Sequence, residues 1–90
     1  MELTSEERQI LPELIHDYEE YLAQRREQLN TMRRQLSKLT LVDKLFGVDE
    51  EKQQKISALP ADIIILQNDI EINQGRLDKL RSLLNEVSRH

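Results

Sequence analysis

The chain has 90 residues and a formal net charge of −4. This length fits one domain, because single domains usually span roughly 50 to 200 residues, and the acidic balance argues against a surface built to neutralise phosphate. Charged residues make up 33% of the sequence and aromatic residues 3%, with two glycines and two prolines. This composition is typical of long exposed helices, so we expect an all-α protein.

The chain contains no cysteine, which excludes disulfides, a thiolate nucleophile and a cysteine zinc site. This fits a reducing compartment, and we expect the cytoplasm. Residues 1–7 are acidic and polar, where a signal peptide would be basic and then apolar. The longest apolar run, Ile63 to Leu66, is far shorter than a bilayer span. We therefore expect neither an export signal nor a membrane span.

The first helix has a clear start signal. Thr4 followed by Glu7 fits a capping box, which predicts a helix that begins near Ser5. Pro12 lies inside this helix, where proline removes one hydrogen bond and crowds the preceding turn. Either the helix kinks at this proline or a short lead-in helix ends near Leu11, and we favour a kink or a restart. Nothing further breaks the pattern, so the first arm is expected over about residues 5–39.

The chain is expected to reverse near its middle. The apolar periodicity loses its phase over residues 40–49, which we expect to form the tip of a hairpin. Gly47 suits a left-handed helix terminus and Asp49 can cap the next helix, so the turn is predicted at these positions. The second arm is expected over about 50–88. Pro60 disturbs its early part, where we expect either a kink or a short helix followed by a long one that starts at the proline.

Each arm carries a ribbon of residues that recur at alternating spacings of three and four, as in a coiled-coil seam. The ribbon of the first arm consists of Leu11, Ile15, Tyr18, Leu22, Arg25, Leu29, Met32, Leu36 and Leu39. The ribbon of the second arm consists of Ile56, Leu59, Ile63, Leu66, Ile70, Asn73, Leu77, Leu80, Leu84 and Val87. We expect the single domain, residues 1–90, to be an antiparallel two-helix coiled-coil hairpin.

One polar residue interrupts each ribbon, Arg25 in the first and Asn73 in the second. Facing residues of an antiparallel pair have position numbers with a constant sum, and these two add to 98. The other ribbon pairs then add to 98 or 99, and the same register places Glu19 opposite Arg81. We interpret Arg25 and Asn73 as register-setting residues, a role that polar seam residues play at some cost in stability. A functional site in the middle of the hairpin is the alternative.

A single seam leaves most of each helix exposed, so the hairpin has little core. Apolar residues off the seam would need another surface. On the arms these are Ile10, Leu14, Tyr21, Ile64, Ile65, Ile72 and Leu83, and at the tip Leu41, Leu45, Phe46 and Val48. We expect a homodimer of hairpins that forms a four-helix bundle. The alternatives are a different protein whose helices complete the bundle, and a lone monomer with scattered exposed apolar residues.

No catalytic, cofactor or metal motif stands out in the sequence. His16 and Glu20 have the spacing that places two ligands on one helix face, but no third or fourth ligand is identifiable. We interpret His16 as a surface residue. No acidic pair lies beside an apolar stretch that would raise a carboxyl pKa for acid catalysis. We therefore expect no enzymatic activity, no cofactor and no metal.

The first arm also carries a run of basic residues, Arg26, Arg33, Arg34 and Lys38. The net charge and the lack of stacking aromatic residues argue against nucleic acid as a partner. We interpret the run as a solvated face or a surface for an acidic partner. The favoured function is a protein–protein interaction module, a small adaptor or regulatory subunit that presents helix faces and the apolar tip. The alternative is a dimeric nucleic-acid-associated regulator that uses these basic residues.

Overall fold

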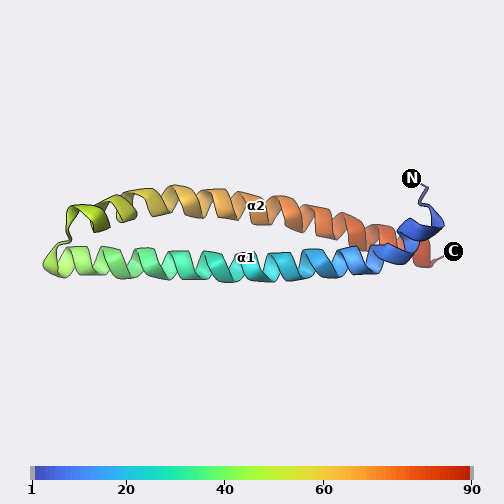
Figure 1. Ribbon diagram of the computed structural model, residues 1–90, viewed down its shortest axis with the longest axis horizontal. Coiled ribbons are helices and arrows are strands. Elements are labelled where there is room, and N and C mark those ends of the chain that lie inside the picture. The colour runs from blue at the N-terminus through green and yellow to red at the C-terminus, as the bar shows by residue number, and fades with distance from the viewer. Residues whose placement is uncertain (1, 90) are drawn as a thin grey trace.

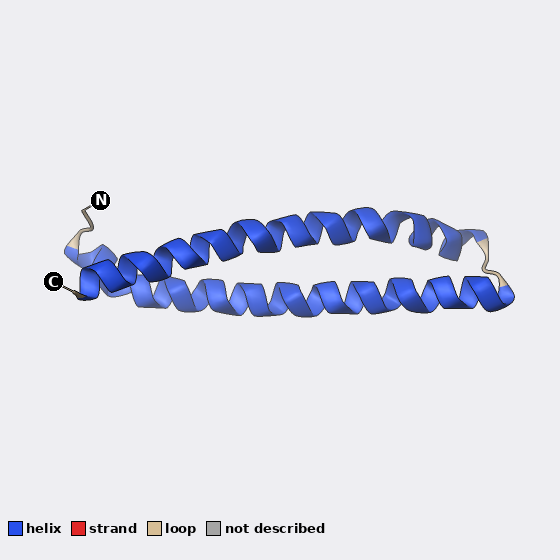
Figure 2. Cartoon of the chain, turned by 180° about the vertical axis from the view of Figure 1, so that it is seen from behind, coloured by secondary structure: helices blue, strands red, loops and turns tan. Residues whose placement is uncertain are grey.

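The computed structural model describes residues 2–89 and consists of two long antiparallel helices joined by a short turn (Figures 1 and 2). α1 spans Ser5–Phe46 and α2 spans Glu50–Ser88. The helices lie side by side and form a rod with extents of 64 × 17 × 16 Å, with the start of α1 and the end of α2 at the same end of the rod (Figure 1). The predicted all-α two-helix hairpin is confirmed.

The start of α1 has the predicted capping box. The hydroxyl of Thr4 accepts a hydrogen bond from the backbone N–H of Glu7 at 3.1 Å, and a carboxylate oxygen of Glu7 accepts one from the N–H of Thr4 at 2.8 Å. The helix begins at Ser5, as predicted. Because the backbone N–H and then the side chain of Thr4 stabilise its charged form, the pKa of Glu7 lies below its ordinary value of 4.5.

Both prolines lie inside continuous helices. α1 runs through Pro12 and α2 runs through Pro60, so the expected breaks at these residues, with a separate short helix before either proline, are wrong. A proline removes a single hydrogen bond, and the flanking turns are held by buried seam residues such as Leu11 and Ile15 beside Pro12 and Ile63 beside Pro60. The expected kink is present in α1, whose first turns, coloured dark blue, lie at an angle to the rest of the helix (Figure 1).

The reversal lies at Gly47 and the two residues after it. Gly47 has φ 75° and ψ 162°, and its N–H donates to the carbonyl oxygen of Asp43 at 3.0 Å. This backbone conformation is open to glycine and strained for other residues. Asp49 then caps α2 by accepting a hydrogen bond from the N–H of Lys52 at 2.9 Å. The predicted turn is confirmed.

The tip is more helical than expected. α1 extends to Phe46, about two turns beyond the end predicted for the first arm at residue 39. The apolar periodicity loses its phase in this segment, but no glycine or proline stands before Gly47 to end the helix. The apolar residues at positions 41–46 therefore project from the last turns of a helix.

The core lies along the two ribbons. One buried cluster consists of Leu11, Ile15, Leu22 and Leu77, and a second consists of Leu29, Ile63 and Leu66. Half-buried Ile70 packs against both clusters. Leu22 is the one fully buried large side chain among the described residues. The predicted pairing of Glu19 with Arg81 is confirmed by an ion pair with 3.2 Å between Oε2 and Nη2.

Candidate protein-interaction face

The hairpin has two flanks, one on each side of the seam, and each is identified by the polar contacts that cross it. On one side Arg81 pairs with Glu19, and Arg26 donates a hydrogen bond to Gln74. We call this side the Arg26 flank. On α1 it is formed by His16, Glu19, Ala23, Arg26, Asn30, Arg33, Ser37, Thr40 and Lys44. On α2 it is formed by Ser57, Pro60, Ile64, Gln67, Glu71, Gln74, Asp78, Arg81 and Asn85. Exposed polar and charged groups predominate on it.

On the other side the hydroxyl of Tyr21 donates a hydrogen bond to Oδ2 of Asp69 at 2.6 Å. We call this side the Tyr21 flank. Its α1 stripe consists of Ile10, Leu14, Asp17, Tyr21, Gln24, Gln28, Thr31, Gln35, Lys38, Val42 and Leu45. Its α2 stripe consists of Ala58, Asp62, Ile65, Asp69, Ile72, Arg76, Lys79, Leu83 and Glu86. Residues spaced alternately by three and four lie on one side of a helix, so each stripe runs beside the seam.

Exposed apolar side chains gather on the Tyr21 flank. Nine large hydrophobic side chains are exposed, and six of them lie there: Ile10, Leu14, Val42, Leu45, Ile65 and Ile72. Of the other three, Leu41 lies on the outer surface, Phe46 lies at the tip, and Ile64 lies on the α2 stripe of the Arg26 flank. The Arg26 flank therefore carries one of the nine and the Tyr21 flank carries six. The two sides of the hairpin therefore differ sharply in polarity.

The residues that the sequence predicts for partner binding differ in their exposure and in the contacts they already make within the hairpin. Tyr21 is half-buried and its hydroxyl already contacts Asp69 within the hairpin. Leu83, expected to need another surface, is half-buried against the first core cluster. Val48 is half-buried in the turn. Phe46 is 83% exposed at the end of α1.

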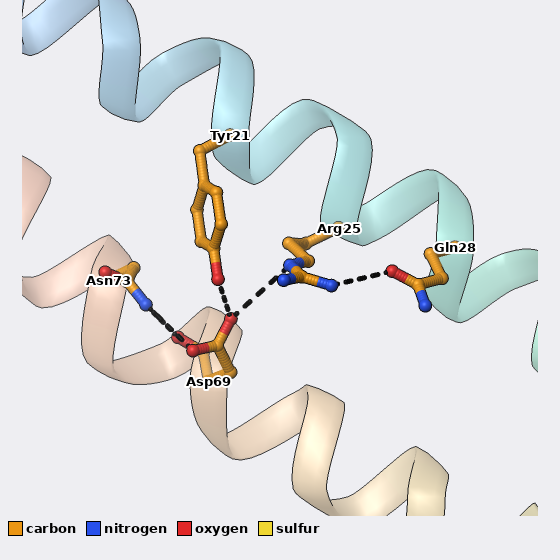
Figure 3. A network of polar contacts seen from close by, with 5 residues as sticks. All are labelled: Tyr21, Arg25, Gln28, Asp69 and Asn73. Carbon is orange, nitrogen blue, oxygen red and sulfur yellow. Dashed lines mark hydrogen bonds and ion pairs between the residues drawn. The ribbon is translucent and has the colours of Figure 1, made fainter.

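A polar network around Asp69 lies in the middle of the Tyr21 flank (Figure 3). Oδ2 of Asp69 accepts the hydrogen bond from Tyr21 and lies 3.8 Å from Nε of Arg25. Asn73 donates from Nδ2 to the backbone oxygen of Asp69 at 2.8 Å and to its Oδ1 at 3.2 Å. Arg25 also donates to Gln28 at 2.9 Å, and its guanidinium lies 5.0 Å from the centre of the Tyr21 ring. Asp69 thus joins the two polar seam residues.

The network explains how two polar residues fit in an apolar seam. Asn73 is buried, and its amide is satisfied within α2 by Asp69. Arg25 reaches the edge of the seam, where its side chain is 39% exposed and that of Asp69 is 38% exposed. An ion pair this exposed contributes at most about 1 kcal/mol. Sequence reasoning missed Asp69 because it lies off the ribbon; its spacing of four residues before Asn73 was the available signal.

Two concave patches lie on the Tyr21 flank on either side of this network. One is lined by Asp17, Tyr18, Tyr21 and Asn73. The other is lined by Arg25, Gln28, Met32, Asp62, Ile65, Leu66 and Asp69. Each patch combines apolar side chains with a carboxylate. A shallow patch of this kind can receive side chains of another helix.

The basic residues of α1 are distributed around the helix. Arg26 and Arg33 lie on the Arg26 flank, Lys38 lies on the Tyr21 flank, and Arg34 lies on the outer surface. Arg26 is in addition hydrogen-bonded to Gln74. The run that is contiguous in the sequence therefore does not form one continuous basic face in the hairpin.

His16 lies 3.0 Å from Glu20, and both side chains are more than half exposed. Within residues 2–89 no group of three potential ligands is placed to hold a metal ion. Over the same residues neither helix is both long and apolar enough to cross a membrane.

Comparison of the chain with protein-family models, with curated proteins and with solved structures finds no significant match in any of the three.

Proposed function

We propose that this protein is a non-enzymatic protein–protein interaction module, a small adaptor or regulatory subunit of the cytoplasm. Its two helices form a coiled coil, and the Tyr21 flank together with the apolar tip binds another polypeptide. The observation that carries the proposal is the one-sided distribution of exposed apolar side chains, six of nine on a single flank. The absence of cysteine fits a reducing compartment.

The balance of buried and exposed apolar residues supports this proposal. Seven hydrophobic side chains are buried along the seam, whereas nine large ones are exposed. Each square ångström of apolar surface removed from water contributes about 25 cal/mol, so a large share of the available stabilisation is left unused in the single hairpin. Scattered exposed apolar residues are normal, but gathering on one flank is typical of an interface.

The tip offers a second contact region. Leu41, Leu45 and Phe46 are 56%, 63% and 83% exposed, and they project from the last turns of α1. A large exposed aromatic side chain is a common anchor in protein interfaces, where it fills a pocket of the partner. The tip therefore extends the interaction surface beyond the flank.

The proposal is tested by hydroxyl-radical footprinting of the protein in an extract of the cells that express it, compared with the dilute purified chain. Ile65 and Ile72 on the Tyr21 flank should be protected in the extract, because a partner of any kind covers them. Ile64, which is 56% exposed on the opposite, Arg26 flank, is the matched control and should be labelled equally in both samples. Equal labelling of all three isoleucines contradicts the proposal.

A further inference from the structure

We infer that the Tyr21 flank is covered by a second copy of this chain, which packs antiparallel about a two-fold axis that passes close to Gln28. The inference rests on the proposed function, because it names the occupant of the same face. It follows from the order of apolar, acidic and basic residues along the two stripes of this flank.

The α1 stripe is complementary to itself when it is reversed. Facing residues of two antiparallel identical helices have position numbers with a constant sum. A sum of 55 or 56 places Ile10 opposite Leu45 and Leu14 opposite Val42 of the second copy. At both ends of the stripe, apolar side chains then pack against apolar side chains of the second copy. These four residues are 49%, 63%, 40% and 39% exposed in that order, so they are available for such contacts.

The charges on the same stripe follow the same rule. Asp17 faces Lys38 of the second copy, and by symmetry the pair occurs twice. Neither residue takes part in an ion pair within residues 2–89. The remaining positions of the stripe are uncharged: Tyr21 faces Gln35, Gln24 faces Thr31, and Gln28 faces itself at the axis. No like charges oppose each other, which favours association of two copies.

Other alignments of α1 are worse. A shift by one heptad to a sum of 48 or 49 places Ile10 opposite Lys38 and Leu14 opposite Gln35. A shift in the other direction places Asp17 opposite Leu45. Each shift removes the ion pair and leaves apolar side chains against polar ones, so the register is set by the whole stripe.

Along the α2 stripe the charged residues next to Ile72 change from acidic to basic, and Ile72 lies nearly level with the two-fold axis. Asp62 and Asp69 lie on the side of the turn, Arg76 and Lys79 lie on the side of the termini, and Ile72 lies between them. With position numbers that add to 144 or 145, Ile72 faces Ile72 of the second copy and Asp69 faces Arg76 on both sides of the axis. Farther out, Ile65 faces Lys79, Asp62 faces Leu83, and Ala58 faces Glu86. In the hairpin register Ile72 is opposite position 26 of α1, which is about 3 Å along the rod from Gln28. One two-fold axis can thus serve both helices.

The alternative dimer, with the two turns at the same end, fits less well. In that arrangement α1 of one copy lies on α2 of the other, and residues at the same height face each other. Ile72 would oppose Gln24, Ile65 would oppose Thr31, and Ile10 would oppose Glu86. Leu14 would meet Leu83 and Asp17 would meet Lys79, but Ile10, Ile65 and Ile72 would all meet polar side chains. In the antiparallel dimer Ile10 meets Leu45 and Ile72 meets itself, so that of these three only Ile65 meets a polar side chain.

Single cysteine variants test the geometry directly, because the natural chain has no cysteine. In Gln28→Cys the two thiols meet at the axis, so mild oxidation should yield a disulfide-linked dimer as the main product. In Lys38→Cys the two thiols lie about 30 Å apart along the rod, far beyond the reach of a disulfide. Lys38→Cys is therefore the control, and under native conditions it should form the disulfide-linked dimer no faster than it does when unfolded in urea. Equal cross-linking of the two variants overturns the inference.

Charge reversal provides the second test, with the dissociation constant measured by sedimentation equilibrium and helix content by circular dichroism. Asp17→Lys or Lys38→Asp alone should weaken the dimer about tenfold, because each places two pairs of like charges together. The double variant D17K/K38D restores both ion pairs and should bind within about threefold of the natural chain. Additive weakening in the double variant overturns the inference.

Failure of the inference can be distinguished from failure of the proposed function. A purified chain that stays monomeric while Ile65 and Ile72 are protected in the extract means that a different protein covers the flank, so the inference is wrong and the proposed function stands. A monomeric chain without protection in the extract means that both are wrong.

Discussion

Leu22 is the most informative single position for the stability of the hairpin. Its side chain is 0% exposed and belongs to the first core cluster with Leu77. Replacing a buried leucine by alanine costs about 2–5 kcal/mol, depending on how far the cavity collapses. Here the neighbouring Tyr18 and Leu80 are only half-buried and can settle into the space. We therefore expect Leu22→Ala to lower the free energy of unfolding by about 3 kcal/mol.

This loss is large for a chain of this size, because a domain of 90 residues has a total stability of roughly 5–13 kcal/mol. The assay is urea unfolding followed by far-UV circular dichroism, at one protein concentration so that association does not shift the midpoint. Leu41→Ala is the matched control, since Leu41 is 56% exposed and the same atoms are removed. It should change stability by less than about 0.5 kcal/mol. Equal losses in the two variants would refute the assignment of the core.

Four further predictions follow from single features of the hairpin. The double variant Arg25→Leu and Asn73→Leu should preserve or raise the melting temperature, since it replaces polar seam residues by apolar ones; a fall in melting temperature contradicts their interpretation as register-setting residues. Gly75→Ala should raise the free energy of unfolding by about 1 kcal/mol in urea titrations, because Gly75 is helical and an added Cβ would meet nothing within 4 Å. A loss of stability would show that this glycine is required. Because the pKa of Glu7 is lowered in the folded chain, its contribution is present above the ordinary value of 4.5 and is lost as the pH falls through the lowered pKa. Acid titrations of stability should show a smaller slope below that value for Glu7→Gln, and an unchanged slope contradicts the role of the capping box. Finally, a gel-shift titration at low salt should show no DNA or RNA binding at micromolar protein, because the basic residues of α1 are distributed around the helix; a salt-dependent shift would favour the alternative of a nucleic-acid-associated regulator.

Local chemistry made the ends of the helices predictable from the sequence. Thr4 and Glu7 form a capping box whose two hydrogen bonds need only a spacing of three. Gly47 and Asp49 marked the turn, because one permits a backbone conformation that strains other residues and the other caps the next helix. These signals are short in sequence and depend little on the rest of the fold.

The register was predictable because it depends on a repeated pattern. The ribbon pairs, which add to 98 or 99, predicted a register in which Glu19 and Arg81, with a sum of 100, face each other beside the seam, and the structure has this ion pair. Continuity through Pro12 and Pro60 was not predictable, because it depends on whether packing along the seam compensates one lost hydrogen bond in each helix. The helix propensity of single residues says nothing about how much stabilisation packing along the seam provides.

The candidate site was only partly predictable. The apolar residues off the seam could be read from the sequence, but their division between two flanks depends on which cross-helix contacts form. Asp69 was missed because its partners Tyr21 and Arg25 lie on the other helix, more than forty positions away in the sequence. An acidic residue beside a seam is usually solvated, so the sequence alone provided no reason to assign Asp69 a contact with the other helix.

The mass of the purified chain in solution tests the central claim most directly, by light scattering coupled to size exclusion. The natural chain should have twice the mass of 10.7 kDa at micromolar concentration. Ile72→Lys should shift it to the monomer, because it places a charge close to the two-fold axis of the Tyr21 flank. Ile64→Lys, on the opposite Arg26 flank, should leave the dimer intact. A natural chain that elutes at 10.7 kDa over the whole accessible concentration range, or a dimer that is indifferent to Ile72→Lys, contradicts self-association through this flank.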